Sequence, residues 1–250
     1  MGTRAVNNWF ADEQFWNTFG DCMFHPASFR VAQEQAPLLV ELAGGQQHRI
    51  LDLGCGPGRH AVPLAKLDQQ VTGVDLIGVL LDQAREVAAT AGAQVEWVQA
   101  DMREFSRPDT FDLIISMWSS FGYFDDPADD LRVLQRCREN LAPGGTLVLD
   151  LVGKEIVCRD LEPVHVTELD DGAMLVERPV LEEQMTVYSN EWTLIRDGVA
   201  HQAHWHHQLY SGAELRNLLA DAGFEQIDLQ ADLSGADYDF DAERLVAVAR

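Results

Sequence analysis

The chain has few basic residues. Its 250 residues include 18 lysines and arginines against 41 aspartates and glutamates, a formal net charge of -23 at pH 7. Proteins that bind nucleic acid need a basic surface to meet the phosphate backbone. We therefore expect no nucleic-acid partner. An acidic surface favours cationic substrates, but it also serves solubility, and the sequence leaves both alternatives open.

Long hydrophobic runs are also missing. No run of 18 or more apolar residues occurs, and the segment from Met1 to Phe10 has neither the basic start nor the apolar stretch of a secretory signal. We expect a cytoplasmic protein with no membrane partner.

Clustered metal ligands are scarce. The four cysteines form no C-x-x-C pair, which argues against a zinc knuckle or a disulfide framework: Cys22, Cys55, Cys137 and Cys158. A histidine-rich run does occur at residues 201–207. On a strand, His204 and His206 would share one face, and His201 and His207 the other. At most two neighbouring ligands then point the same way, so we expect no metal and predict histidines that are solvated or line a pocket.

What the sequence does contain is an alternation of short apolar strands and helices over residues 48–152. Strands are predicted at Arg49–Leu53, Gln70–Asp75, Gln94–Gln99, Phe111–Ser116 and Thr146–Val152. Helices are predicted between them at His60–Leu67, Gly78–Ala91 and Pro127–Leu141. The near-continuous apolar strands indicate a doubly wound α/β fold, with a mostly parallel sheet and helices on both faces.

We expect a single domain over residues 1–250, in which three segments surround this 48–152 core. Residues 1–47 are rich in aromatics and helical, and serve either as core or as an N-terminal lid. Residues 160–210 carry hairpin signals at Asp170-Asp171-Gly172 and Asp197-Gly198, which predict an antiparallel β insertion after the fifth strand. In residues 211–250 we predict a helix at Ala213–Ala222, followed by strands at Phe224–Gln230 and Arg244–Ala249.

The strongest functional signal is ILDLGCGPGR at residues 50–59, an apolar strand that runs into a glycine-rich turn. Glycines let a ligand approach the main-chain N–H groups, so a cofactor can lie against Gly54, Gly56 and Gly58. The second strand ends in Asp75, 19 positions after Gly56. This distance suits a carboxylate that accepts hydrogen bonds from ribose hydroxyls, and the alternative is a helix N-cap.

Two further acids end strands of the same core. Asp101, with Met102 beside it, follows the third strand, where an adenine would sit; the alternative is a loop-capping aspartate and a buried methionine. Asp52 is near the end of the first strand and could act on the ammonium group of an amino-acid cofactor. The third glycine of the turn comes two residues after the second rather than three, which weakens a nicotinamide-dinucleotide interpretation.

The segments LDLGCGPG, GVDL, QADM, FDLIISMWSSFGYF and LAPGG, in this order, resemble the class I S-adenosylmethionine-dependent methyltransferases. The resemblance implies a seven-stranded sheet with an antiparallel last strand, and S-adenosyl-L-methionine as cofactor with S-adenosyl-L-homocysteine as product. It places Gly54 to Gly58 beside the methionine portion, Asp75 and Leu76 at the ribose, and Asp101 with Met102 at the adenine. The segment after the fourth strand, which includes Met117, would line the methyl donor.

The acceptor is less well defined than the cofactor. The SSFGYF stretch is similar to small-molecule methyltransferases, and the Asn/Asp-Pro-Pro-Tyr/Phe signature of DNA amino methylation is absent, so we expect a small acceptor. Candidate catalytic groups are Tyr123, His207 and Tyr210, and candidate substrate-binding residues are Trp16, Trp118 and Tyr123. Transfer to N or O is the main hypothesis. The alternatives are an NAD-dependent oxidoreductase and a non-catalytic cofactor-binding regulator. The sequence leaves the oligomeric state open.

Overall fold

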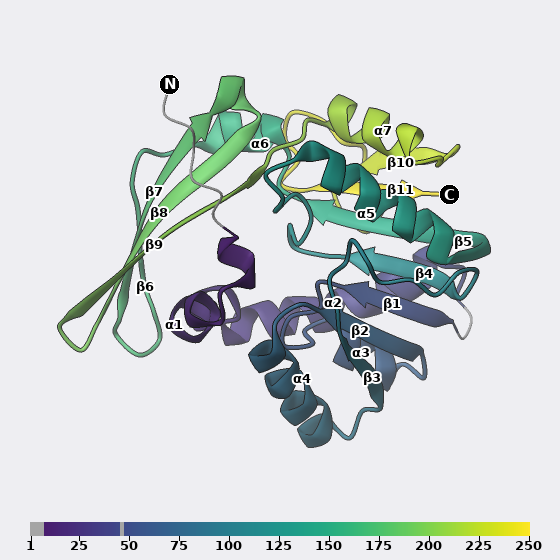
Figure 1. Ribbon diagram of the computed structural model, residues 1–250, viewed down its shortest axis with the longest axis horizontal. Coiled ribbons are helices and arrows are strands. Elements are labelled where there is room, and N and C mark those ends of the chain that lie inside the picture. The colour runs from purple at the N-terminus through teal and green to yellow at the C-terminus, as the bar shows by residue number, and fades with distance from the viewer. Residues whose placement is uncertain (1–7, 46–47) are drawn as a thin grey trace.

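The computed structural model describes residues 8–45 and 48–250. Its larger sheet has seven strands in the order β10-β11-β5-β4-β1-β2-β3 (Figure 1). The strands are β1 (Arg49–Leu53), β2 (Gln70–Asp75), β3 (Val95–Gln99), β4 (Phe111–Ser116), β5 (Leu141–Leu151), β10 (Ile227–Gln230) and β11 (Leu245–Ala249). β11 runs antiparallel to β5 and β10, and the other neighbours are parallel. The expected mostly parallel seven-stranded sheet is confirmed.

Helices cover both faces of this sheet. Leu51 of β1 packs with side chains of α5 (Pro127–Asn140) and α7 (Gly212–Asp221) on one face. Its neighbour Ile50 packs with α2 (Pro26–Leu42) and α3 (Ala61–Lys66) on the other. Both side chains have no exposed surface. Burial on both faces explains why the strands are continuously apolar, and each such side chain contributes about 1.5–3 kcal/mol.

The helices begin and end where the sequence supplies capping groups. α4 (Gly78–Ala91) ends at Gly92, which has a left-handed backbone. The Asp126 side chain accepts from Ala128 N at 2.9 Å to cap α5, and acidic residues occupy its first turn. Ser211 and Glu214 form a capping box at the start of α7.

The antiparallel insertion folds as a second sheet of four strands in sequence order. They are β6 (His165–Glu168), β7 (Met174–Glu182), β8 (Val187–Arg196) and β9 (Val199–Gln208), with a short 3₁₀ turn, η2 (Glu183–Met185), between β7 and β8. Asp171-Gly172 and Asp197-Gly198 lie in the turns between β6 and β7 and between β8 and β9, as their hairpin signals predict.

Several elements differ from the sequence prediction, and β10 begins at Ile227 rather than Phe224. β5 begins at Leu141 rather than Thr146, and pairs with β4 across a register irregularity between Phe111 and Leu113. The seven-residue helix α6 (Lys154–Asp160), which was not predicted, leads from β5 into the insertion. It buries only Ile156, so it leaves little hydrophobic periodicity in the sequence.

The first two elements of the N-terminal segment lie between the two sheets (Figure 1), and its third, α2, covers one face of the larger sheet. The segment consists of η1 (Trp9–Ala11), α1 (Glu13–Met23) and α2, and residues 1–7 of the expected lid fall outside the described residues. Trp9, Phe15 and Phe19 are buried in one cluster with Leu80 of α4 and Trp192 of β8. These aromatic side chains are therefore part of the core, and a role of the segment as a lid stays a prediction. No helix in the ranges 8–45 and 48–250 is long and apolar enough to cross a membrane.

Candidate active site

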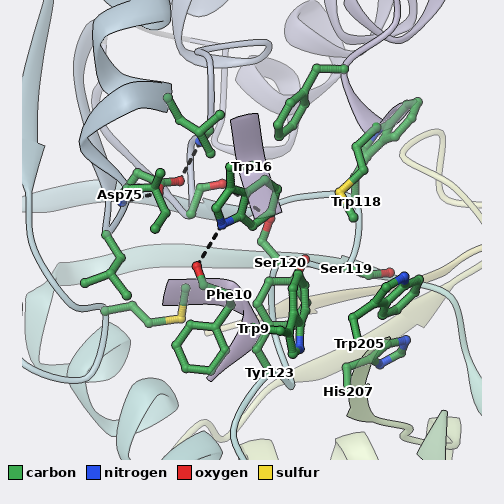
Figure 2. Close-up of a pocket in the computed structure, with 18 of the residues that line it drawn as sticks. Trp9, Phe10, Trp16, Asp75, Trp118, Ser119, Ser120, Tyr123, Trp205 and His207 are labelled. Carbon is green, nitrogen blue, oxygen red and sulfur yellow. Dashed lines mark hydrogen bonds between the residues drawn. The ribbon is translucent and has the colours of Figure 1, made fainter. Parts of the chain in front are cut away.

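A cavity of about 410 Å³ lies between the carboxyl ends of the parallel strands and the inner face of the insertion sheet. The carboxyl edge of a parallel sheet is where open α/β folds bind their ligands. Figure 2 shows Asp75 on one side of the cavity, Trp205 and His207 on the other, and Trp9 and Tyr123 between them. The predicted site residues in its wall are Trp16, Gly54, Gly56, Asp75, Leu76, Asp101, Met102, Trp118, Tyr123 and His207.

The glycine-rich turn provides space for a ligand. Gly54 has a φ of +73°, and a β-carbon there would lie 2.9 Å from the Ser120 Cβ. Gly56 has a φ of +52° and would bring its β-carbon 3.2 Å from the Phe24 ring. A side chain at either position would strain the backbone and fill the cavity wall. Gly58 lies elsewhere: its β-carbon would lie 2.8 Å from the Trp97 ring, so it serves the packing of α3 on the sheet.

Asp75 ends β2 with its carboxylate turned back to the glycine-rich turn. Its Oδ2 accepts from Gly56 N at 2.7 Å, and its Oδ1 accepts from Ile77 N at 2.9 Å. Ile77 is itself the N-cap of α4, so the alternative of Asp75 as that helix's N-cap is wrong; Asp75 instead holds the turn that leads into the helix. Burial raises the pKa of Asp75, and the backbone donors counteract that rise. A carboxylate has about four acceptor positions, so both oxygens keep capacity for ligand hydroxyls.

Asp101 and Met102 form the next part of the wall. Arg103 Nη2 contacts Asp101 Oδ2 at 2.6 Å, and Arg103 N donates to Asp101 Oδ1 at 2.8 Å. The carboxylate is therefore held by the loop that it caps. The Met102 methyl group would lie 3.5 Å from a β-carbon at Gly54, which places this flexible apolar side chain against the glycine-rich turn.

Asp52 is buried beneath that turn, and the charge of the partly buried Arg59 acts on it. Asp52 is 2% exposed and its Oδ2 has no hydrogen-bond partner among the described residues. Burial raises the pKa of Asp52 to about 7, and the charge of Arg59 limits the rise. The Arg59 guanidinium lines the cavity, 5.0 Å from the centroid of Phe24 and 4.6 Å from that of Trp118. Burial lowers the pKa of Arg59 to about 10, so it stays charged near neutral pH.

The segment after β4 enters the cavity through two left-handed residues. Trp118 and Ser119 have φ values of 57° and 62°, which is unusual for residues other than glycine. Asp150 holds this bend: its main-chain oxygen accepts from Ser119 N at 2.8 Å, and its Oδ2 accepts from Trp118 N at 3.3 Å. Arg244 Nε contacts the other carboxylate oxygen of Asp150 at 2.6 Å. The bend places Trp118, Ser119 and Ser120 in the cavity wall.

The far end of the cavity, which we call the acceptor end, is aromatic. It comprises Trp9, Tyr123, Tyr188, Trp205 and His207, together with Glu177 and Trp192. The β8–β9 register pairs Tyr188 with His207 and Asn190 with Trp205, so one face of the insertion sheet supplies most of this wall. His207 Nδ1 lies 2.8 Å from the Gln208 main-chain oxygen. Because a carbonyl only accepts, Nδ1 carries the proton and Nε2 keeps its lone pair. Burial lowers the pKa of His207, so the ring is neutral.

Hydrogen bonds tie the acceptor end to the rest of the site. Trp9 Nε1 donates to the His206 main-chain oxygen at 2.7 Å, and His206 Nε2 contacts Asp125 Oδ1 at 2.7 Å. Trp16 Nε1 donates to the Phe10 main-chain oxygen at 2.8 Å (Figure 2). The alternation of the histidine run follows the expected strand pattern, with His207 in the cavity wall and His204 on the opposite, exposed face. In the described part of the chain, no three of its His, Cys, Asp and Glu side chains are grouped to hold a metal.

Four predicted site residues are not in the cavity wall: Asp52, Gly58, Met117 and Tyr210. Met117 is 3% exposed and packs in the cluster on the α2 and α3 face. Tyr210 donates from its hydroxyl to Asp130 Oδ2 at 2.6 Å and contacts the Phe121 ring at 5.8 Å, on the α5 side. Burial, and then the neighbouring Asp130, raise the pKa of this phenol. The structure therefore does not bring Tyr210 to the cavity as a base.

Sequence analysis missed several residues of the wall. Arg59 directly follows the glycine motif, and this position could have indicated that it lies in the cavity wall. Glu177, Tyr188, Trp192 and Trp205 lie on three strands of the insertion. The alternation of side chains along a strand predicts that Tyr188 and Trp192 share a face. It does not predict that this face lies against the carboxyl edge of the larger sheet.

Comparisons with known proteins agree with this geometry. Residues 50–145 match the family model described as a methyltransferase domain. The ubiquinone biosynthesis O-methyltransferase of Colwellia psychrerythraea is 29% identical over 153 residues, 57% of this chain and 61% of that protein. The chain spans between half and about three fifths of the first three curated relatives it matches.

Solved structures show the same fold. The CcbJ methyltransferase from Streptomyces caelestis superposes with a TM-score of 0.78 at 24% identity, over 88% of each chain. The S-adenosylmethionine-bound amino pentose methyltransferase CalS10 from Micromonospora echinaspora superposes with a TM-score of 0.69 at 18% identity, over 100% of this chain and 98% of that one. At these identities the likeness establishes the fold.

Residues 50–145 match a methyltransferase domain, and the fold around them is that of solved S-adenosylmethionine-dependent methyltransferases. The glycine-rich turn, Asp75, and the segment after β4 all lie at the carboxyl edge of this methyltransferase sheet. The match favours the methyltransferase hypothesis over the nicotinamide alternative, in agreement with the glycine spacing.

Proposed function

We propose that residues 1–250 act as one unit that transfers a methyl group from S-adenosylmethionine to a nitrogen or oxygen of a small acceptor. The observation that carries the proposal is the single cavity that joins the glycine-rich turn to the aromatic acceptor end. One end meets the requirements of the cofactor, and the other is walled by side chains of the insertion and the N-terminal segment. The volume of about 410 Å³ suits small molecules.

The residues at the cofactor end fit S-adenosylmethionine. Asp75 has free acceptor capacity for two ribose hydroxyls, and Met102 can pack on the adenine beside Asp101. Gly54 and Gly56 leave room that a β-carbon would fill. Arg59 makes no hydrogen bond or ion pair within the described ranges, so its guanidinium is available to the cofactor carboxylate. Asp52 lies behind the turn and would act on the ammonium group through it.

When bound, S-adenosylmethionine supplies a methyl group on a positively charged sulfur, which an acceptor lone pair displaces. The protein's contribution is to hold the acceptor in line and to exclude water. Trp9, Tyr123 and Trp205 supply apolar walls for this purpose. His207, neutral with a free Nε2, is the group best suited to take a proton from the acceptor.

The names of two similar proteins point to different acceptor atoms. CalS10 is named as an amino pentose methyltransferase, and the Colwellia protein as an O-methyltransferase. The proposed function therefore covers both nitrogen and oxygen.

The test is calorimetric titration of the purified protein with S-adenosylhomocysteine and, separately, with NADH. We expect micromolar binding of S-adenosylhomocysteine and none of NADH. Binding of NADH alone would overturn the proposal. Tight S-adenosylhomocysteine binding without methyl transfer to any compound of a small-molecule acceptor panel would instead favour a non-catalytic cofactor-binding protein.

A further inference from the structure

The rings at the acceptor end form a continuous aromatic wall. Trp205 and His207 stack with centroids 5.9 Å apart and planes 13° apart. Tyr188 lies 5.5 Å from Trp205 and 5.3 Å from His207. Trp9 lies 5.7 Å from Trp205 and connects the wall to Tyr123 at 4.7 Å. Faces of tryptophan and tyrosine carry negative electrostatic potential, so such a wall attracts cations.

A carboxylate lies in the same wall. Glu177 of β7 stands opposite Trp192 of β8 in the strand register, and both line the cavity. Its Oε1 accepts from Asn190 Nδ2 at 3.4 Å. The ion pairs found within residues 8–45 and 48–250 do not include Glu177. His165, its register partner on β6, and hydrogen bonds from Trp192 and Asn190 act to lower the pKa of Glu177.

Glu177 differs from the other charged residues in the cavity wall. Arg59, Asp75 and Asp101 all belong to the cofactor end. Burial raises the pKa of Glu177, which means that its ionised form lacks full compensation in the free protein. A cation bound beside it would supply the missing partner, whereas a neutral acceptor would leave this partly buried charge uncompensated.

We propose that the acceptor is an amine, held as an ammonium ion by the rings of Tyr188 and Trp205 and by the Glu177 carboxylate. This inference rests on the proposed methyl transfer and names the class of its acceptor. A phenol or alcohol could donate a hydrogen bond to Glu177 but would not neutralise its charge, and a phenolate would be repelled by it. Trp205 Nε1, which is buried without a partner in the described chain, can also donate to an oxygen elsewhere on the same amine.

The transfer step balances with the residues present. The bound ammonium gives one proton to His207 Nε2 and becomes a neutral amine. Its nitrogen lone pair then forms a bond to the methyl carbon while the carbon–sulfur bond breaks, and that electron pair stays on sulfur. The product is an N-methylated ammonium ion, so the charge beside Glu177 is the same before and after transfer. The proton on His207 leaves to water.

The test uses two probes of one shape, choline and its neutral carbon analogue 3,3-dimethylbutan-1-ol, titrated into protein saturated with S-adenosylhomocysteine. We expect choline to bind at least tenfold more tightly than the analogue. Glu177→Gln should lower choline affinity about tenfold and leave the neutral analogue unchanged. Glu191→Gln is the matched control, because Glu191 pairs with Arg178 in the β7–β8 register and faces the opposite side of the sheet. It should change neither affinity.

The saturation step separates the two proposals. Failure of the wild-type protein to bind S-adenosylhomocysteine overturns the methyl-transfer proposal itself. Normal S-adenosylhomocysteine binding, with equal affinities for choline and the analogue or with no choline binding, overturns only the amine class. S-adenosylhomocysteine binding also reports whether Glu177→Gln is folded, and if that variant is not folded, the wild-type comparison of the two probes decides.

Discussion

Asp75 is the residue on which the placement of the cofactor depends most directly. Asp75→Ala removes the acceptor of the proposed ribose hydroxyls, the hydrogen bond from Gly56 N in the glycine-rich turn and the one from Ile77 N before α4. We expect S-adenosylhomocysteine binding to weaken by about 2–4 kcal/mol, measured by calorimetry. Asp82→Ala, at an exposed position on α4, is the control and should bind normally. Unchanged affinity in folded Asp75→Ala would rule out the ribose placement.

Asp52 gives a prediction about stability and pH. Its pKa is about 7 in the folded protein against 3.8 for the free carboxyl, so the folded state keeps a proton that the unfolded chain loses. The contribution of Asp52 to the free energy of unfolding therefore falls as pH rises from about 4 to about 7. Asp52→Asn removes this dependence. As pH rises from about 4 to about 7, the free energy of unfolding of Asp52→Asn should therefore increase relative to that of wild type by up to about 4 kcal/mol.

Urea unfolding of both proteins at pH 4.5, 6 and 7.5 would measure this shift. Asp82→Asn, which changes an exposed carboxylate, is the control and should run parallel to wild type. Parallel curves for Asp52→Asn and wild type would show that Asp52 ionises normally in the folded protein. A gain in stability by Asp52→Asn together with weaker S-adenosylhomocysteine binding would mean that this carboxylate is retained for the cofactor at a cost in stability.

At the scale of elements, the contact between the segment after β4 and the end of β9 depends on Gly122. Its φ is +98°, and a β-carbon would lie 2.9 Å from the Gln208 main-chain oxygen. Gln208 N also donates to the Gly122 oxygen at 2.6 Å. Gly122→Ala should push β9 away, moving His207 and Trp205 out of position, because both ends of this contact are backbone.

We expect Gly122→Ala to lower the free energy of unfolding by about 1–3 kcal/mol more than Gly235→Ala does. Gly235 is the matched control, since its φ of +90° is similar but a β-carbon there would meet nothing within 4 Å. The difference between the two variants isolates the contact from the backbone strain that both share. Equal losses in urea unfolding would show that β9 does not need this close approach.

The elements themselves were largely predictable, because burial on both faces leaves a clear signal. The predicted ranges of β1, β2, β4 and α4 agree with the structure to the residue. α6 was missed because seven residues with one buried side chain give no periodicity. Cofactor-end residues such as Asp75 could be predicted because their spacing along the chain is set by one strand–helix–strand unit. The acceptor end could not, since Glu177 and Trp205 reach it only through the docking of the second sheet.

At the scale of the whole molecule, the cavity is assembled from segments far apart in the chain. Trp9, Tyr123 and Trp205 come from η1, the segment after β4, and β9, and the Trp9 ring contacts the other two. Such an arrangement exists only when the insertion sheet and the N-terminal segment are both docked. The ordering of the acceptor end is therefore coupled to the stability of the complete fold.

The net charge of -23 acts on that complete fold. Repulsion among unpaired carboxylates favours the unfolded chain, where the charges lie farther apart, and dissolved salt screens it. We therefore expect the unfolding temperature at pH 7.5 to rise as NaCl is increased from about 20 to about 500 mM, a range over which the screening length falls from about 20 Å to about 4 Å. Differential scanning calorimetry would measure the rise.

The control uses the same protein near its isoelectric point of about 4.5, where the net repulsion vanishes. There the dependence on NaCl should be small, although protonation lowers the unfolding temperature itself. If salt raised the unfolding temperature equally at both pH values, the cause would be a general effect of salt on apolar burial. A rise confined to pH 7.5 would mean that the acidic surface costs the fold stability. The same field, strongest at low salt, would then draw cations toward the molecule, as an ammonium acceptor requires.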